Sequence, residues 1–87
     1  MDMTLESFYK QQLKKIFLDL FQIQITPENE SKNFTDELGI DSLDITELFI
    51  EVEKVYNIKI SLEALEAIRS FQGLNDYLIK TILPLKK

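Results

Sequence analysis

The side chains best placed for chemistry lie between positions 36 and 47, where one serine stands among carboxylates. A serine hydroxyl can act as a nucleophile beside a general base, or it can be the point where another enzyme attaches a group. The chain contains no histidine and no cysteine. A Ser-His-Asp relay, imidazole metal ligation, thiolate metal sites and disulfides are therefore excluded. Because no serine here can have a histidine partner, a hydrolase or transferase activity is the least expected function.

A calcium site is the alternative use of these acids. Asp36 and Glu47 have the spacing of positions 1 and 12 of an EF-hand loop. The positions between them do not fit, because Leu38 and Ile40 replace oxygen ligands and Asp41 stands where a glycine is needed. We expect no metal site.

Composition sets the class of partner. With 87 residues, 45% of them hydrophobic, the chain suits one domain, residues 1–87, with a single core. The net charge of -5 favours basic protein surfaces over nucleic acid and anionic membranes. Residues 1–6 carry neither a basic nor an apolar leader segment, and no apolar run is long enough to span a bilayer. We expect a cytoplasmic monomer that does not insert into membranes.

The first helix is expected over residues 5–21, where apolar residues recur on one face. Residues 21–25 alternate like a strand, but no second strand pattern exists to pair with them, so they are interpreted as helix end and loop entry. Residues 26–33 are polar and form the longest loop. Phe34 and Leu38 would pin the far end of this loop to the core.

The second helix should run to Tyr56, with either Asp41 or Ser42 as its N-cap. Asp44 and Glu47 in its first turns suit the positive end of the helix dipole. Ser61 and Ser70 can cap a short third helix and a last helix, which ends before Pro84. The prediction is an all-α fold, a small up-down four-helix bundle with three longer helices and one short third helix.

The second helix carries more apolar residues than one core stripe needs. The core stripe is expected to contain Ile45, Leu48, Phe49, Val52, Val55 and Tyr56. Leu43 and Ile50 fall on the opposite side, among Thr46, Glu47, Glu51 and Lys54. Aliphatic side chains ringed by acids resemble a surface for docking basic partners, although single exposed aliphatic residues are also common.

Residues 36–44, Asp-Glu-Leu-Gly-Ile-Asp-Ser-Leu-Asp, closely resemble the attachment motif of acyl carrier proteins, in which the serine of Asp-Ser-Leu carries 4'-phosphopantetheine. The similarity extends from the first helix to Leu78, and includes Phe34, Glu47-Leu48 and Phe71-Gln72. A serine at the start of a helix is also suited to a phosphate on physical grounds. Taken alone, Ser42 is more simply interpreted as an ordinary N-cap. Only the similarity of the whole segment up to Leu78, at matching spacing, favours the carrier interpretation.

The resemblance implies a discrete acyl carrier protein, a phosphoprotein with the fold of this family. It implies that Ser42 is loaded from coenzyme A by a phosphopantetheinyl transferase. Acyl thioesters would then be delivered to synthases and transferases of fatty-acid biosynthesis or of related acyl or polyketide pathways in lipid metabolism. The implied partner-docking residues are Asp41, Leu43, Asp44, Thr46, Glu47, Ile50, Glu51 and Glu53. The implied acyl-chain pocket consists of Leu48, Val52, Ile60 and Ile68.

Two alternatives remain beside this prediction. An aminoacyl or peptidyl carrier would more often have a glycine-rich approach to the serine, whereas Gly39, Ile40 and Asp41 precede it here. An unmodified helical adaptor would bind a protein partner and would not need Ser42 at all. Lys54 stands where fatty-acid carriers usually have an acid, which leaves the pathway open.

Overall fold

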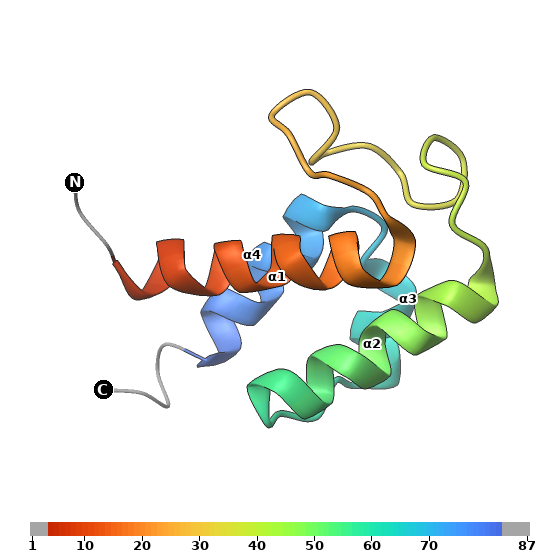
Figure 1. Ribbon diagram of the computed structural model, residues 1–87. Helices are drawn as coiled ribbons and strands as arrows, with labels where there is room; N and C mark the ends of the chain where they lie inside the picture. The colour runs from red at the N-terminus through yellow and green to blue at the C-terminus, as the bar shows by residue number, and fades with distance from the viewer. Residues whose placement is uncertain (1–3, 83–87) are drawn as a thin grey trace.

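A computed structural model describes residues 4–82 of the chain (Figure 1). These residues form four helices and no strand: α1 Leu5–Phe21, α2 Ser42–Tyr56, α3 Leu62–Ala67 and α4 Phe71–Ile82. Three longer helices and one short third helix confirm the predicted all-α bundle. α1 and α2 run in opposite directions, with the long loop joining their ends (Figure 1). Pro84, the predicted stop after α4, lies outside the described residues.

The helix boundaries follow from caps that the sequence contains. Thr4 Oγ1 accepts the amide of Ser7 at 3.0 Å and begins α1. α1 ends at Gln22, whose φ of 56° turns the chain into the left-handed region. Residues 22–26 are not a strand, as predicted. Ser61 and Ser70 accept the amides of Ala64 and Gly73, each at 3.1 Å, at the starts of α3 and α4.

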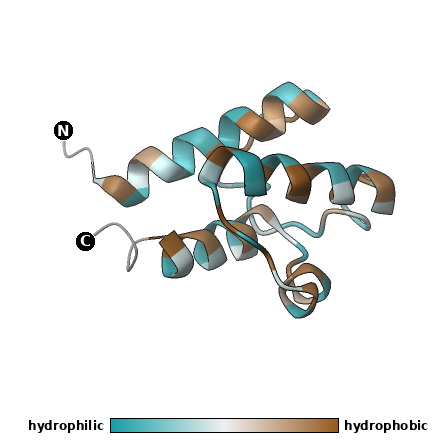
Figure 2. Ribbon diagram, turned by 90° about the horizontal axis from the view of Figure 1, so that it is seen from below, coloured by the Kyte–Doolittle hydropathy of each residue, from teal (hydrophilic) through white to brown (hydrophobic). Residues whose placement is uncertain are grey.

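Aromatic residues from three parts of the chain meet in the core. Phe17 of α1 lies 5.6 Å from Phe34 and 5.4 Å from Phe71 of α4, measured between ring centroids. Each of these three side chains is at most 1% exposed. Figure 2 shows that hydrophobic and hydrophilic residues are mixed along the helices. The loop residue Phe34 is thus part of the core, as predicted, and it holds the segment that leads to α2.

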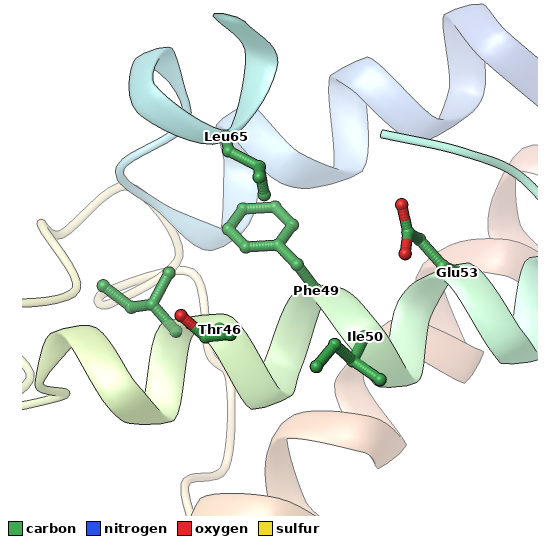
Figure 3. Close-up of a pocket in the computed structure, with 6 residues that line it drawn as sticks. Thr46, Phe49, Ile50, Glu53 and Leu65 are labelled. Carbon is green, nitrogen blue, oxygen red and sulfur yellow. The ribbon is translucent and has the colours of Figure 1, made fainter. Parts of the chain in front are cut away.

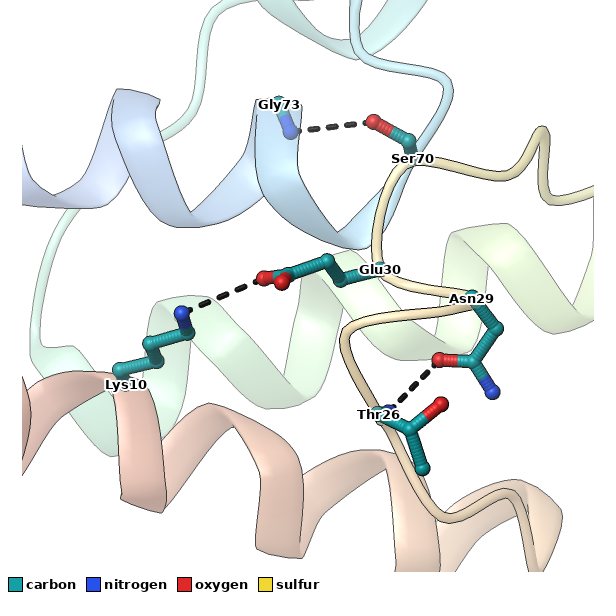
Figure 4. A network of polar contacts seen from close by, with 6 residues as sticks. All are labelled: Lys10, Thr26, Asn29, Glu30, Ser70 and Gly73. Atoms are coloured by element: carbon teal, nitrogen blue, oxygen red, sulfur yellow. Dashed lines mark hydrogen bonds and ion pairs between the residues drawn. The ribbon is translucent and has the colours of Figure 1, made fainter.

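The long loop is also fixed by polar contacts (Figure 4). Lys10 of α1 forms an ion pair with Glu30 at 3.2 Å, and Asn29 Oδ1 accepts the amide of Thr26 at 2.8 Å. The amide of Gln72 donates to the carbonyl of Glu30 at 2.8 Å. The loop is therefore tied to both α1 and α4.

Some residues expected in apolar stripes are exposed. Val55 is 41% exposed, although it was predicted to lie in the core stripe of α2. The stripe is centred on Leu48, Val52 and Tyr56, so that Val55 falls at its edge, in the last turn of the helix. Leu5 and Phe8, at 50% and 47% exposure, lie in the first turns of α1.

Neither a membrane-spanning helix nor a metal-binding cluster occurs among residues 4–82. Within this range no helix combines the length and apolar character that a membrane crossing requires. The same residues contain no cluster of three or more His, Cys, Asp or Glu side chains that could hold a metal ion.

Candidate functional site

The N-terminus of α2 is capped by Asp41, and the structure thereby decides between the two predicted caps. The amide of Asp44 donates to Asp41 Oδ1 at 2.9 Å, and the amide of Ile45 donates to the Asp41 carbonyl at 3.0 Å. Asp41 has the extended backbone of an N-cap, with φ -84° and ψ 175°. Ser42 is consequently the first residue inside the helix.

This arrangement leaves the Ser42 hydroxyl free of a capping role. Ser42 is exposed, and no hydrogen bond of its hydroxyl is found among residues 4–82. Its carbonyl, by contrast, accepts the hydroxyl of Thr46 at 3.0 Å. Ser61 and Ser70 use their hydroxyl oxygens as caps. Ser42 therefore presents a hydroxyl to solvent that the fold does not use.

The approach to Ser42 is ordered by a compact turn. The side chain of Asn33 accepts the amides of Thr35 and Asp36 at 2.9 and 3.0 Å, and Glu37 Oε1 accepts the amide of Asn33 at 2.8 Å. These contacts were not predicted from the sequence. An Asn followed four positions later by Glu resembles a capping box, in which the spacing is three.

Gly39 and Ile40 complete the approach. Gly39 has a φ of +72°, a conformation that disfavours side chains. Ile40 is 3% exposed, and its amide donates to the carbonyl of Phe34 at 2.9 Å. The segment is thus anchored immediately before Asp41, which fixes where α2 begins.

The site can be tested for its fit to a phosphate group. The first amides of a helix lack partners within the helix, and the positive end of the dipole favours an anion there. No hydrogen bond from the amides of Ser42 and Leu43 is found among the described residues. The carboxylates of Asp41 and Asp44 would repel the negative charge of the phosphate. The site is exposed, however, and water and salt screen this repulsion. A phosphodiester on Ser42 fits these residues.

The predicted docking residues form an exposed surface on α2, with one exception. Leu43 is 69% exposed and Ile50 49%. Asp41, Thr46 and Glu47 are also exposed, and Asp44 and Glu51 are partly exposed. We call the seven residues Asp41, Leu43, Asp44, Thr46, Glu47, Ile50 and Glu51 the α2 docking face.

Glu53 is the exception, because it is partly buried and its Oε2 accepts the amide of Ile60 at 2.8 Å. This bond ties α2 to the segment before α3. Leu62, at the start of α3, is 70% exposed.

A cavity of about 160 Å³ lies between α2 and α3 (Figure 3). It is lined by Ile45, Thr46, Phe49, Ile50, Glu53 and Leu65. The four residues predicted for an acyl-chain pocket are buried in the core instead: Leu48 and Val52 at 0% exposure, and Ile60 and Ile68 at 8%. None of these four is among the residues that line the cavity, and their contact with an acyl chain stays a prediction.

Known proteins are similar to this chain over a range that includes the site described above. Residues 11–78 match the family described as the phosphopantetheine attachment site. The chain is similar to the acyl carrier protein of Syntrophus aciditrophicus (strain SB), with 38% identity over 78 residues, or 87% of this chain and 90% of that protein. It is 42% identical over 57 residues to the acyl carrier protein of Chlorobium phaeobacteroides, covering 66% of this chain and 69% of the other. With the acyl carrier protein of Buchnera aphidicola subsp. Schizaphis graminum it shares 33% identity over 69 residues, 79% of this chain and 87% of that protein.

Proposed function

The chain belongs to the acyl carrier protein family, and we propose that Ser42 is the residue to which its 4'-phosphopantetheine is attached. The family is defined by covalent attachment of this group, and Ser42 lies inside the matched range of residues 11–78. As a member, the chain is a carrier protein and not an enzyme.

One observation supports Ser42 above the two serines that cap helices, Ser61 and Ser70. The cap of α2 is Asp41 and not the serine, so a group on the Ser42 oxygen costs the helix no hydrogen bond. The same modification at Ser61 or Ser70 would esterify the oxygen that caps α3 or α4 and would place a bulky group against that hydrogen bond. Ser42 is also exposed, as a substrate of another enzyme must be.

The group would supply a terminal thiol that holds acyl chains as thioesters, which this cysteine-free chain cannot supply itself. The protein's own part is to hold the attachment point at the mouth of α2. The amides of Ser42 and Leu43 would face the phosphate, and the anchored turn at Gly39 and Ile40 would keep that mouth in place.

The α2 docking face would recognise the partner enzymes. Leu43 and Ile50 supply exposed apolar area, and Asp44, Glu47 and Glu51 surround it with negative charge. An apolar centre gives affinity, while an acidic rim raises the association rate with basic surfaces. The partners would be a phosphopantetheinyl transferase and acyl synthases or transferases with basic docking surfaces.

We place the protein in fatty-acid biosynthesis in the cytoplasm. In this proposal, residues 1–87 act as one domain and as a monomer. The relatives' name specifies an acyl group as cargo, which ranks this role above aminoacyl or peptidyl transport.

Intact-protein mass spectrometry after incubation with coenzyme A and a phosphopantetheinyl transferase of broad specificity tests the attachment. We expect one added group on the unchanged chain and on Ser61→Ala, the matched control, and none on Ser42→Ala. Addition to Ser42→Ala would assign another residue. No addition to the unchanged chain by several active transferases would favour the unmodified adaptor.

A further inference from the structure

A groove between α1 and the segment that follows it is opposite in charge to the α2 docking face. Its volume is about 440 Å³, and it is lined by Gln11, Lys14, Lys15, Leu18, Gln24 and Ile25. α1 contains three lysines against the carboxylates of Glu6 and Asp19. Of the four helices within residues 4–82, it is the one with a positive net charge. We call this feature the α1 groove.

The two lysines of the α1 groove are available to a partner. Lys10, the third lysine of α1, is already paired with Glu30 at 3.2 Å (Figure 4). Lys15 is exposed and Lys14 is partly exposed, and no ion pair of either is found in the part of the chain that the structure describes. The groove therefore carries two ammonium groups that the fold does not use.

An exposed leucine lies beside these cations. Leu18 is 49% exposed, and it follows Lys14 by four positions and Lys15 by three. This spacing places the three side chains next to one another on the surface of α1. The α1 groove thus repeats the plan of the α2 docking face, an apolar centre beside charges, with the opposite sign of charge.

The α2 docking face can receive one such leucine. Leu43, Thr46, Glu47 and Ile50 follow one another at offsets of three, four and seven positions, all four are exposed, and four residues in this pattern form the hole that a side chain of a facing helix enters. If Leu18 fills this hole, the lysines one turn away meet the carboxylates around it. Charged residues that flank such a contact form ion pairs between the helices.

The occupant of the α1 groove must therefore be acidic with an apolar centre, and a second copy of this chain carries such a surface. We propose that two copies associate, with the α1 groove of one against the α2 docking face of the other. Nucleic acid and anionic membranes also attract lysines, but the net charge of -5 repels them. The contact is small and its ion pairs are exposed, so the association is weak.

This association goes beyond the proposed function and does not depend on the attachment at Ser42. It covers the α2 docking face and so competes with partner enzymes, and the monomer is the form that those enzymes bind.

Sedimentation equilibrium of the unmodified chain, from about 10 µM to about 1 mM, tests the association in the range expected of a small contact. In 0.1 M salt we expect the average mass to rise above the 10.2 kDa of one chain as concentration increases. At about 1 M salt it should return toward that value, because the Debye length falls from about 10 Å to about 3 Å. A mass that stays at one chain throughout, or that rises with salt, would refute the proposal.

A charge exchange tests which surfaces meet. Lys14→Glu with Lys15→Glu makes the α1 groove acidic. Glu47→Lys with Glu51→Lys makes the α2 docking face basic. Each double variant alone should keep the mass of one chain, whereas their equimolar mixture should associate, because the exchanged groove matches the exchanged face. Each pair of changes alters the net charge of -5 by four, so both variants stay negative and general attraction between them does not mimic this result. A mixture that does not associate contradicts the assigned surfaces.

Two further variants complete the test. Lys32→Glu with Lys59→Glu is the matched control, since both lysines are exposed and lie outside the groove. It changes the net charge as the groove variant does and should leave the salt-dependent association in place. Leu18→Gln changes no charge and should remove most of the association. If a charge variant does not fold, Leu18→Gln still decides, because unchanged association in that variant overturns the assigned contact.

Discussion

The division of roles between Asp41 and Ser42 makes a prediction that two substitutions can test. In the structure the carboxylate of Asp41 accepts the Asp44 amide at 2.9 Å, whereas Ser42 is exposed and its hydroxyl makes no hydrogen bond within residues 4–82. Asp41→Ala should therefore destabilise α2, and Ser42→Ala should not. The opposite result is expected of an ordinary serine N-cap.

The size of each effect follows from the contacts. Removing an N-cap typically costs about 1 kcal/mol, and the carboxylate's interaction with the helix dipole adds about 0.3–1 kcal/mol at an exposed site. For a domain of this size, 1 kcal/mol shifts the melting temperature by roughly 4–8 °C. We expect Asp41→Ala to lower it by about 4–10 °C. Ser42→Ala should change the free energy of unfolding by less than about 0.5 kcal/mol.

The assay is urea and thermal unfolding of the unmodified chain, followed by circular dichroism. Asp41→Asn serves as the control, because asparagine caps as well as aspartate but carries no charge. It should retain most of the stability. A loss in Ser42→Ala equal to that in Asp41→Ala would mean that the hydroxyl is the cap, and the argument for Ser42 as the free attachment point would fail.

Two further predictions concern α2. Burial, with a smaller contribution from Tyr9, raises the pKa of Tyr56, whose hydroxyl donates to the Tyr9 carbonyl at 2.8 Å. The unfolded chain releases this proton above about pH 10 and the folded chain does not, so the free energy of unfolding should fall there by up to about 1.4 kcal/mol per pH unit. In urea titrations Tyr56→Phe should lose about 1 kcal/mol at neutral pH and show a shallower alkaline decline; an identical slope would refute the assignment. Leu43→Gln, at a side chain 69% exposed, should leave unfolding within about 0.5 kcal/mol and raise the KM of the transferase severalfold, whereas an unchanged KM would remove Leu43 from the docking face.

The helices were predictable because their signals are local. Apolar spacing and the caps at Ser61 and Ser70 are properties of neighbouring residues, and the structure uses them as the sequence indicates. The choice between Asp41 and Ser42 was not predictable in the same way. Both side chains offer an oxygen, and only the backbone geometry set by the turn before α2 decides which one caps the helix.

The residues that line the cavity were beyond prediction for a different reason. Phe49 was assigned to the core stripe and is indeed buried, yet its ring also lines the cavity toward Leu65. Periodicity assigns a residue to a side of a helix, but it does not show whether the neighbouring helix packs closely against it. That depends on where α3 lies, and the six residues of α3 include none that is buried.

The side chains of α2 therefore point toward three different surroundings. Leu48, Val52 and Tyr56 face the core, Phe49 and Glu53 face the cavity, and Leu43 faces solvent on the docking side. Changes on the solvent side should leave the core intact, which is why unfolding and partner kinetics can be tested with different variants.

Ile50 stands where two of these sides meet. It is 49% exposed, belongs to the α2 docking face and also lines the cavity. A partner that covers Ile50 would therefore also contact the wall of this cavity.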